Sequence, residues 1–569
     1  MAGRPLPDRP ILPRRRPGEA IRSVRLPPAS RLALLRDSSQ ERRPRGPGSM
    51  ELPGPCDHPP PPWSELIPPD ARVVLEVGCG EGLSAEAYRR RNPGVVYIGI
   101  EPDQGKAVQA SRRVDRLVVG PADALLGPTP CLAPASVDCL ILTRLIDGCP
   151  ALDRTIDEAC RLLATDGVLL AWTALAGDVA DRWRARFEPR GMCLVDLEPW
   201  EPGRAPFDDG AACPEPHRTL RSILRLVRSD RQPSRLLLQT LAATPICSRI
   251  RTEEPDRALR TLPGVRTRTD YAVAPLLAER PGEARVLILQ RSILGRRDLE
   301  GIRRFRQAGY LIVSEWDDDP SIFPEVATQE ALTFRACHCV QTSTQPLAEV
   351  LRAFHPVVAV FPNRVFELPP RVLRRAEGPV SIVFAALNRE NDWAEIMPAL
   401  RRVLVDVKDA VRVDVVHDRA FFDALPPVPK TFRPFLPYAD YVAVLQQSDI
   451  ALLPLMPSRF NRCKSDLKYL ECAALGVACL AAPTVYADSI RHGETGMVYR
   501  SPSEFEAMLR QLIADAALRQ SLASAAYREV ARSRMLGQVF RERYLWYEQM
   551  IARLPELDRD LCDRVPELA

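Results

Sequence analysis

Long apolar runs are missing from this sequence of 569 residues. No apolar stretch approaches the ~18–20 residues that a membrane-spanning helix requires. The N-terminus carries arginines but lacks the apolar segment of a secretory signal. We therefore expect a cytoplasmic protein and predict no membrane-spanning segment. Peripheral contact with a membrane stays open at this point.

Closely spaced cysteine pairs are also missing, although the chain contains 15 cysteines. No CxxC pair occurs, and the closest two thiols, Cys337 and Cys339, flank a histidine. Structural zinc sites use such pairs, and disulfide frameworks need a regular set of cysteines. We therefore expect reduced thiols and no structural zinc site.

A large excess of charge of one sign is absent as well. The 78 basic residues face 73 acidic ones, and the formal net charge is +5. Residues 1–50 hold twelve arginines and four acids, so the rest of the chain is close to neutral. Nucleic-acid binding needs a concentrated basic surface, so no nucleic-acid partner is predicted. Only five of the basic residues are lysines, a usage that we expect of a GC-rich bacterial genome.

The first segment, residues 1–68, is rich in proline and arginine and lacks the periodicity of a helix or a strand. Proline runs such as residues 59–62 favour disorder. Met50 is an alternative to Met1 as the true start. A basic arm that binds anionic lipid or nucleic acid is the alternative interpretation of this segment.

The remaining chain contains three series of short apolar strands that alternate with helices. This alternation is typical of parallel, doubly wound α/β sheets. The first series covers residues 69–228, the second 229–377, and the third 378–569, which closes with helices. A polar stretch with a proline, residues 229–235, is the predicted linker between the first two series. Charged, proline-rich residues 366–378 are the predicted hinge between the last two.

The first strand of the first series, residues 73–77, runs directly into a glycine turn. Gly78, Gly80 and Gly82 lie at alternating positions, and Glu76 precedes them within the strand. Glycines at a strand-to-helix turn let the backbone approach a ligand closely. The order is ExGxGxG, which differs from the GxGxxG of dinucleotide-binding enzymes.

Two further acids follow the next two strands of this series. Glu101 ends the second strand about 20 residues after the turn, where a carboxylate can accept hydrogen bonds from ribose hydroxyls. Asp123 follows the third strand, where it can meet an adenine amino group. Over residues 70–200 this arrangement resembles the class I S-adenosylmethionine-dependent methyltransferases. The resemblance implies S-adenosylmethionine as cofactor, bound on the methionine side by Glu76, Gly78, Gly80 and Gly82, at the ribose by Glu101, and at the adenine by Asp123.

A general base for methyl transfer is not evident from the sequence. Asp147, after the fourth strand, and His217 are the candidates. An SN2 methyl transfer depends heavily on the alignment of donor and acceptor, so a strong base is not required. The residues do not reveal the methyl acceptor.

The third series contains the densest signal of the chain. An apolar strand over residues 450–455 leads through a polar loop into a helix predicted to begin near Ser465. Two of the five lysines, Lys464 and Lys468, lie at this start. A cation beside the free N–H groups of a helix start is suited to a diphosphate. The alternative is that both lysines are merely solvated.

This segment resembles the C-terminal domain of the GT-B glycosyltransferases of the large "group 1" family. The resemblance implies a nucleotide-sugar donor whose ribose is bound by Glu471. The family usually has another Glu eight residues earlier, and Cys463 stands there, which leaves the usual sugar contact in question. Asn363, in a Pro-Asn-Arg-Val element, resembles the family's P-N-G-V element. The implied donor-binding residues are Arg389, Lys464, Ser465, Lys468 and Glu471.

An acidic run, residues 317–319, follows a strand that ends at Val313. A DxD motif would indicate a metal-bound diphosphate in a GT-A enzyme, but the order of elements resembles GT-B enzymes, which usually need no metal. We therefore predict that no metal is required and give the run an acceptor-side or structural role. Asp317 is the candidate catalytic residue of this half.

Together the two resemblances imply a bifunctional bacterial enzyme. It would transfer a sugar from a nucleotide-sugar donor to a glycan or small-molecule acceptor, and a methyl group from S-adenosylmethionine. Surface glycan or glycosylated metabolite biosynthesis is the implied setting, and a lipid-linked acceptor would bring the enzyme to the inner membrane. One alternative is an active methyltransferase with a degenerate, non-catalytic sugar-nucleotide-binding module. A non-catalytic nucleotide-sensing scaffold is the other.

Overall fold

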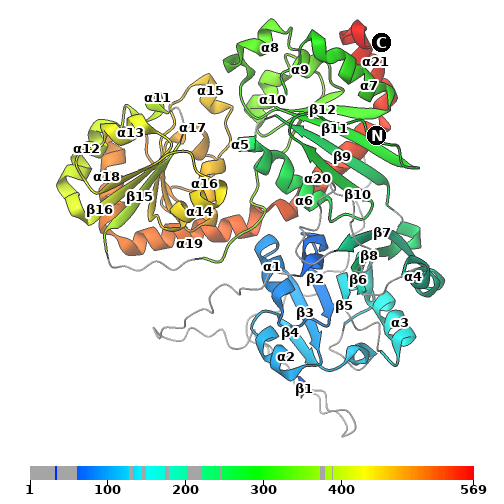
Figure 1. Cartoon of the computed structure of the whole chain (residues 1–569). Coiled ribbons are helices and arrows are strands. Elements are labelled where there is room, and N and C mark those ends of the chain that lie inside the picture. The colour runs from blue at the N-terminus through cyan, green and yellow to red at the C-terminus, as the bar shows by residue number, and fades with distance from the viewer. Residues whose placement is uncertain are drawn as a thin grey trace, which may run out of the picture.

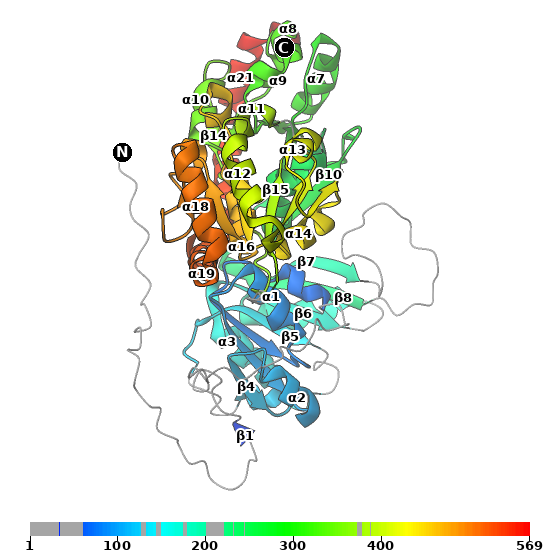
Figure 2. The same cartoon turned by 90° about the vertical axis from the view of Figure 1, so that its left-hand side faces the viewer.

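The structure, a computed structural model, forms three α/β units, each built around its own sheet (Figure 1). The described residues are 33–34, 61–126, 132–143, 149–173, 179–200, 221–231, 233–243, 245–371, 378–386 and 389–569. In both views the first unit lies below the other two (Figure 2). Asp147 and His217 lie outside the described residues.

The first sheet has the strand order β1-β4-β3-β2-β5-β6-β8-β7. Its strands are β1 (Ala33–Leu34), β2 (Val73–Val77), β3 (Val96–Glu101), β4 (Arg116–Val119), β5 (Val137–Thr143), β6 (Leu163–Thr173), β7 (Met192–Trp200) and β8 (Arg221–Arg228). Strands β2 to β6 are parallel, whereas β7 and β8 form an antiparallel pair at one edge. Helices α1 (Leu83–Arg91) and α2 (Gln104–Ala110) pack on one face. Helices α3 (Leu152–Leu162) and α4 (Val179–Phe187) pack on the other face.

The second and third sheets have six strands each, and all their pairings are parallel. The second, ordered β10-β9-β11-β12-β13-β14, contains β9 (Arg235–Ala242), β10 (Val265–Asp270), β11 (Glu283–Gln290), β12 (Tyr310–Glu315), β13 (Cys339–Thr342) and β14 (Val358–Val360). The third, ordered β17-β16-β15-β18-β19-β20, contains β15 (Val380–Ala385), β16 (Val411–Val416), β17 (Lys430–Arg433), β18 (Ile450–Leu453), β19 (Ala478–Ala481) and β20 (Met497–Val498).

The central strands of these sheets are buried along their length, as expected for parallel sheets covered on both faces. The predicted fold class, three α/β units built on parallel sheets, is therefore confirmed, although β1, β7 and β8 join the first sheet through antiparallel pairings. In such sheets the loops at the carboxyl ends of the strands form the crevice where ligands bind. No described helix combines the length and apolar character that crossing a membrane would demand.

The last helices do not pack with the third unit, to which the sequence assigned residues 378–569. Helices α18 (Pro502–Ala514) and α19 (Ala516–Ser533) do cover the third sheet. The chain then returns to the second unit, where α20 (Phe540–Ala552) and α21 (Leu554–Arg564) follow. Tyr547 of α20 belongs to the apolar cluster that contains Ile288 of β11, and Leu561 of α21 belongs to the cluster that contains Leu287 of the same strand. The apolar face of each helix was predictable, but the sheet that it covers was not.

Residues 61–68, which the sequence placed in a disordered tail, belong to the core of the first unit. They form a short 3-10 helix over Pro62–Leu66, and Trp63, Leu66 and Ile67 are buried. The carbonyl oxygen of Pro68 accepts a 2.5 Å hydrogen bond from the Tyr88 hydroxyl. The proline run predicted disorder because it has no periodicity, but the few apolar residues after it suffice to anchor the chain.

Candidate active sites

The turn after β2 requires glycine at more than one position. Gly80 and Gly82 adopt φ values of 57° and 79°, which other residues rarely adopt. A Cβ at Gly82 would lie 3.2 Å from the Ala110 backbone of α2, whereas a Cβ at Gly80 would meet no atom within 4 Å. Gly82 therefore permits the close approach of α2, and Gly80 faces open space that a ligand can occupy. Gly78, with φ 87°, opens the same turn.

Glu101 lies against this turn, as the sequence predicted from its position at the end of β3. Its Oε2 accepts a 2.7 Å hydrogen bond from the backbone N–H of Gly80, and its Oε1 accepts one of 3.1 Å from Asp103. The side chain is almost fully buried. The parallel pairing of β2 and β3 brings the carboxylate and the glycine turn together at one edge of the sheet.

Glu76 points into the core and away from the open space at Gly80. Its carboxylate accepts hydrogen bonds from Trp63 Nε1 at 2.8 Å, Ser84 Oγ at 3.0 Å and the Tyr97 hydroxyl at 2.7 Å. Burial raises the pKa of Glu76, and the hydrogen bonds act in the opposite direction. This geometry fits a residue that anchors the start of the turn, in place of the direct contact that the resemblance implied.

Asp123 lies in a short 3-10 helix, Ala122–Leu126, directly after β4. The backbone N–H of Gly120 donates to the carbonyl of Glu101, so the start of this segment lies beside the end of β3. The Asp123 side chain is half-buried, and among the described residues its carboxylate forms no hydrogen bond or ion pair. Asp123 thus lies near Glu101 with its carboxylate available for a ligand.

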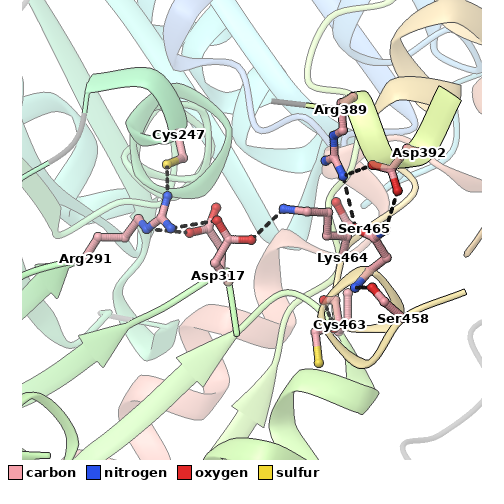
Figure 3. A network of polar contacts seen from close by, with 12 residues as sticks. Cys247, Arg291, Asp317, Arg389, Asp392, Ser458, Cys463, Lys464 and Ser465 are labelled. Carbon is pink, nitrogen blue, oxygen red and sulfur yellow. Dashed lines mark hydrogen bonds and ion pairs between the residues drawn. The ribbon is translucent and has the colours of Figure 1, made fainter. Parts of the chain in front are cut away.

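The second site lies where the loop after β12 meets the loop between α15 (Arg459–Arg462) and α16 (Leu467–Ala474) (Figure 3). Lys464 Nζ donates a 2.8 Å hydrogen bond to Asp318 Oδ1. Arg291 donates to Asp318 Oδ2 at 2.7 Å, and its Nε lies 3.3 Å from Asp317 Oδ1. Burial raises the pKa of Asp317, with Arg291 opposing the shift. The second and third units therefore meet through charged side chains.

Ser465 also contacts the second unit. Its hydroxyl accepts a 2.8 Å hydrogen bond from Asn363 Nδ2. Arg251 donates to Asn363 Oδ1 at 2.8 Å and is itself paired with Glu315, Nε to Oε1 at 2.8 Å. A largely buried chain of polar contacts thus runs from Glu315, at the end of β12, to Ser465, in the loop before α16.

Lys468 and Glu471 lie on the first two turns of α16, which begins at Leu467 and not at Ser465. Both side chains are half-buried. The Tyr441 hydroxyl donates to Glu471 Oε2 at 3.0 Å. Burial lowers the pKa of Lys468, and the Glu471 charge opposes this shift. Burial raises the pKa of Glu471, and Lys468 and the Tyr441 hydrogen bond oppose it.

Arg389 is not a solvated loop residue. Its Nη1 donates to Asp392 Oδ2 at 2.9 Å and to Asn461 Oδ1 at 3.0 Å (Figure 3). The positive charge of Arg389 is also close enough to lower the pKa of Lys468. The structure thus brings Arg389, Lys464 and Lys468 into one region.

Cys463, which stands where the family usually has a Glu, packs into the boundary between the units. It is 3% exposed and contacts the apolar cluster of Trp316 and Phe334 in the second unit. Its carbonyl oxygen accepts a 2.8 Å hydrogen bond from Thr344 Oγ. The position therefore serves to dock the third unit on the second.

Several contacts around this site were not foreseen, although Asp318 belongs to the acidic run 317–319 that was given an acceptor-side or structural role. Asp318 contacts Lys464 directly, Arg291 contacts Asp318, and Tyr441 donates a hydrogen bond to Glu471. His417 follows β16 at φ 76°, and its ring centroid lies 4.9 Å from that of Phe435. The position of chemically active residues just after parallel strands was a usable signal for Arg291 and His417. Within the described residues no group of three or more His, Cys, Asp or Glu could hold a metal ion.

Two parts of the chain match known protein families. Residues 75–171 match a family described as a methyltransferase domain, and residues 395–540 match one described as glycosyl transferase-like. A comparison with curated proteins finds no match.

Similar solved structures include Staphylococcus aureus TarM, at 8% identity and TM-score 0.37, over 47% of this chain and 55% of that one. This chain thus spans about half the length of TarM. Sucrose-phosphate synthase from Thermosynechococcus elongatus matches at 11% identity and TM-score 0.40, over 56% and 99%. A complex between a methyltransferase activator and a putative methyltransferase from Haloferax volcanii matches at 15% sequence identity and TM-score 0.24. The match covers 29% of this chain and 90% of that one. The chain thus contains a part that matches a methyltransferase domain, followed by a part that matches a glycosyl transferase-like family.

Proposed function

We propose that the first unit transfers a methyl group from S-adenosylmethionine, and that the second and third units transfer a sugar from a nucleotide-sugar donor to a glycan or small-molecule acceptor. The setting is bacterial surface glycan or glycosylated metabolite biosynthesis in the cytoplasm, with a lipid-linked acceptor as the reason for contact with the inner membrane. The proposal rests on two groups of residues that are placed to bind a ligand. Gly80 and Glu101 form the first, at the carboxyl ends of β2 and β3, and Lys464, Lys468 and Glu471 form the second, around the start of α16.

The residues of the first site fit S-adenosylmethionine, which supplies an activated methyl group. The open space at Gly80 gives room for the backbone to approach the ligand, and the Glu101 carboxylate lies directly beside it. Asp123 lies near the same edge, and its carboxylate has no hydrogen-bond or ion-pair partner among the described residues. These residues would hold and orient the ligand, so alignment of donor and acceptor is their contribution to catalysis.

Replacing Glu101 with alanine should weaken S-adenosylmethionine binding by about 1.5–3 kcal/mol, because ribose hydroxyls lose a charged hydrogen-bond acceptor. Isothermal titration calorimetry of the full chain measures this change. Glu81→Ala is the matched control, since Glu81 is an exposed acid in the same turn and should bind as the wild type does. A folded wild-type protein that binds no S-adenosylmethionine would refute the proposal for this unit.

The residues of the second site fit a nucleoside diphosphate. A diphosphate carries about two negative charges, and a crevice that buries it must supply cations or N–H groups. Arg389, Lys464 and Lys468 supply the cations. Glu471, held by Tyr441, can accept hydrogen bonds from ribose hydroxyls one turn further along α16.

Two substitutions in this site should differ in kind. Lys464→Ala should weaken UDP or GDP binding by about 1.5–3 kcal/mol and leave uridine or guanosine binding unchanged, because only the phosphates lose a partner. Its binding should also depend less on salt. Glu471→Ala should weaken nucleoside and diphosphate alike. Calorimetry at two salt concentrations measures both, with the exposed Lys408→Ala as control. If both variants bind UDP or GDP as tightly as the wild type does, the nucleotide does not bind at Lys464 and Glu471.

One observation favours the alternative that the second half binds a sugar nucleotide without transferring the sugar. Cys463 takes the place of the family's acid and is buried between the units, so the usual carboxylate contact to the sugar is missing. A mass-spectrometric screen of the purified protein against nucleotide sugars separates the two functions. Donor hydrolysis or transfer supports the glycosyltransferase, and binding without turnover supports the degenerate module.

Helix α1 contacts the second half of the chain at the end that is opposite to the glycine turn. Helix α1 begins after the glycine turn and ends at Arg91, and the carbonyl of Arg90 accepts a hydrogen bond from Leu368 in the second half of the chain. The glycine turn is thus at the end of α1 that lies away from this contact. Direct transfer of a product between the sites is therefore not part of the proposal.

A further inference from the structure

Lys464, a residue proposed to bind the donor diphosphate, is already paired with a carboxylate of the other unit. Its Nζ lies 2.8 Å from Asp318 Oδ1, and the two side chains are 21% and 19% exposed. The partners come from different units and are 146 positions apart in the sequence. A diphosphate that reaches Lys464 must therefore compete with Asp318.

Asp318 does not depend on Lys464 for a counterion. Its second oxygen, Oδ2, accepts a 2.7 Å hydrogen bond from Arg291 Nη2. Arg291 is in turn fixed by Asp317, by a 3.3 Å contact to Cys247 Sγ, and by the ring of Phe323, whose centroid is 5.1 Å away. Asp318 would consequently keep Arg291 as a counterion and remain in place if Lys464 moved away.

The backbone around Lys464 is held independently of its ammonium group. The residues on both sides of Lys464 are hydrogen-bonded to the second unit. The Cys463 carbonyl accepts from Thr344, and the Ser465 hydroxyl accepts from Asn363. The ammonium group itself also contacts the Phe460 ring, with Nζ 4.2 Å from the ring centroid. A lysine side chain has four rotatable bonds, so the ammonium group can change partners without a movement of the units.

We propose that Asp318 is a positioning residue that acts through Lys464. Lys464 is bound to Asp318 in the absence of donor and exchanges it for the diphosphate when the donor binds. The proposal rests on the proposed donor site. It implies that Asp318 lowers the affinity for nucleoside diphosphates, which favours release of the leaving nucleotide, and that its Oδ1 becomes free only after the donor has bound.

Replacing Asp318 with asparagine should tighten the binding of UDP or GDP by about 10- to 100-fold, as expected when one charged hydrogen bond no longer has to be broken. The asparagine oxygen can still accept from Arg291. The same substitution in a Lys464→Ala background should have no such effect. Asp317→Asn, which removes a neighbouring charge without a contact to Lys464, should tighten binding less. The exposed Asp423→Asn should leave it unchanged.

Calorimetry of these variants decides the proposal. A D318N protein with wild-type melting temperature and equal or weaker affinity would overturn it. A gain of affinity that persists in the Lys464→Ala background would also overturn it, because the gain would then come from removing a negative charge near the site and not from releasing Lys464. If the wild type binds neither UDP nor GDP, the proposed donor site itself fails, which is a different outcome.

A second measurement needs no Asp318 variant. The chain has only five lysines, so ¹³C-dimethylation should give few lysine signals in an NMR spectrum, and Lys464→Arg assigns one of them. We expect the Lys464 signal to shift on saturation with UDP or GDP. A Lys464 signal that does not move while the nucleotide binds would contradict the exchange.

Discussion

Replacing Trp63 with alanine is expected to lower the free energy of unfolding of the methyltransferase domain by about 3–5 kcal/mol, the range for loss of a buried aromatic side chain. Trp63 is 8% exposed, and its ring centroid lies 4.9 Å from that of Trp172. It also donates a hydrogen bond to the buried carboxylate of Glu76, which would lose one partner. Because the chain has several units, calorimetry should show one transition moving to lower temperature.

Trp63→Phe is the matched variant. It retains most of the apolar contacts but removes the Nε1 donor, so a loss of about 1–3 kcal/mol is expected for the unsatisfied carboxylate. Both variants should also weaken S-adenosylmethionine binding, because Glu76 begins the glycine turn. If Trp63→Ala melts as the wild type does, residues 61–68 are not part of the core, and the disordered tail predicted from the sequence extends to residue 68.

Replacing Glu315 with glutamine is expected to destabilise the second unit by about 3–5 kcal/mol, because Arg251 would remain charged and buried without its counterion. Both side chains are 1% exposed, and the two hydrogen bonds between them are 2.8 and 3.3 Å long. Burial alone would lower the pKa of Arg251, but the Glu315 charge raises it. Denaturant unfolding monitored by tryptophan fluorescence would measure the loss.

The same substitution should weaken nucleotide binding, since Arg251 orients Asn363, which holds Ser465. An Arg251→Met, Glu315→Leu double variant should recover much of the stability, because no unpaired charge remains, but not the nucleotide affinity. Glu506→Gln is the control: its partners Arg402 and Arg510 are on the surface, so a loss below about 1 kcal/mol is expected. Equal losses in Glu315→Gln and Glu506→Gln would show that the buried pair carries no special stability.

Much of both candidate sites was predictable because it depends on local order and on one rule of parallel sheets. Apolar runs that alternate with helices predicted the α/β units, and the carboxyl ends of neighbouring strands share an edge. Glu101 could therefore be placed beside the glycine turn. Lys464, Ser465 and Lys468 were predictable for a simpler reason, since they lie within five residues of one another at a helix start.

The sequence by itself thus determined the class of the fold, the order of the two parts that match known families, and the positions of the residues that we propose to bind ligands. Only the tertiary structure decided that Trp63 belongs to the core, that α20 and α21 cover the second sheet, and that Lys464 is paired with Asp318. Periodicity shows that an apolar face must be covered but does not identify the unit that covers it. The local sequence around a charged residue likewise does not identify a partner that is 146 residues away. Lys464 and Asp318 come into contact only when the second and third units pack together.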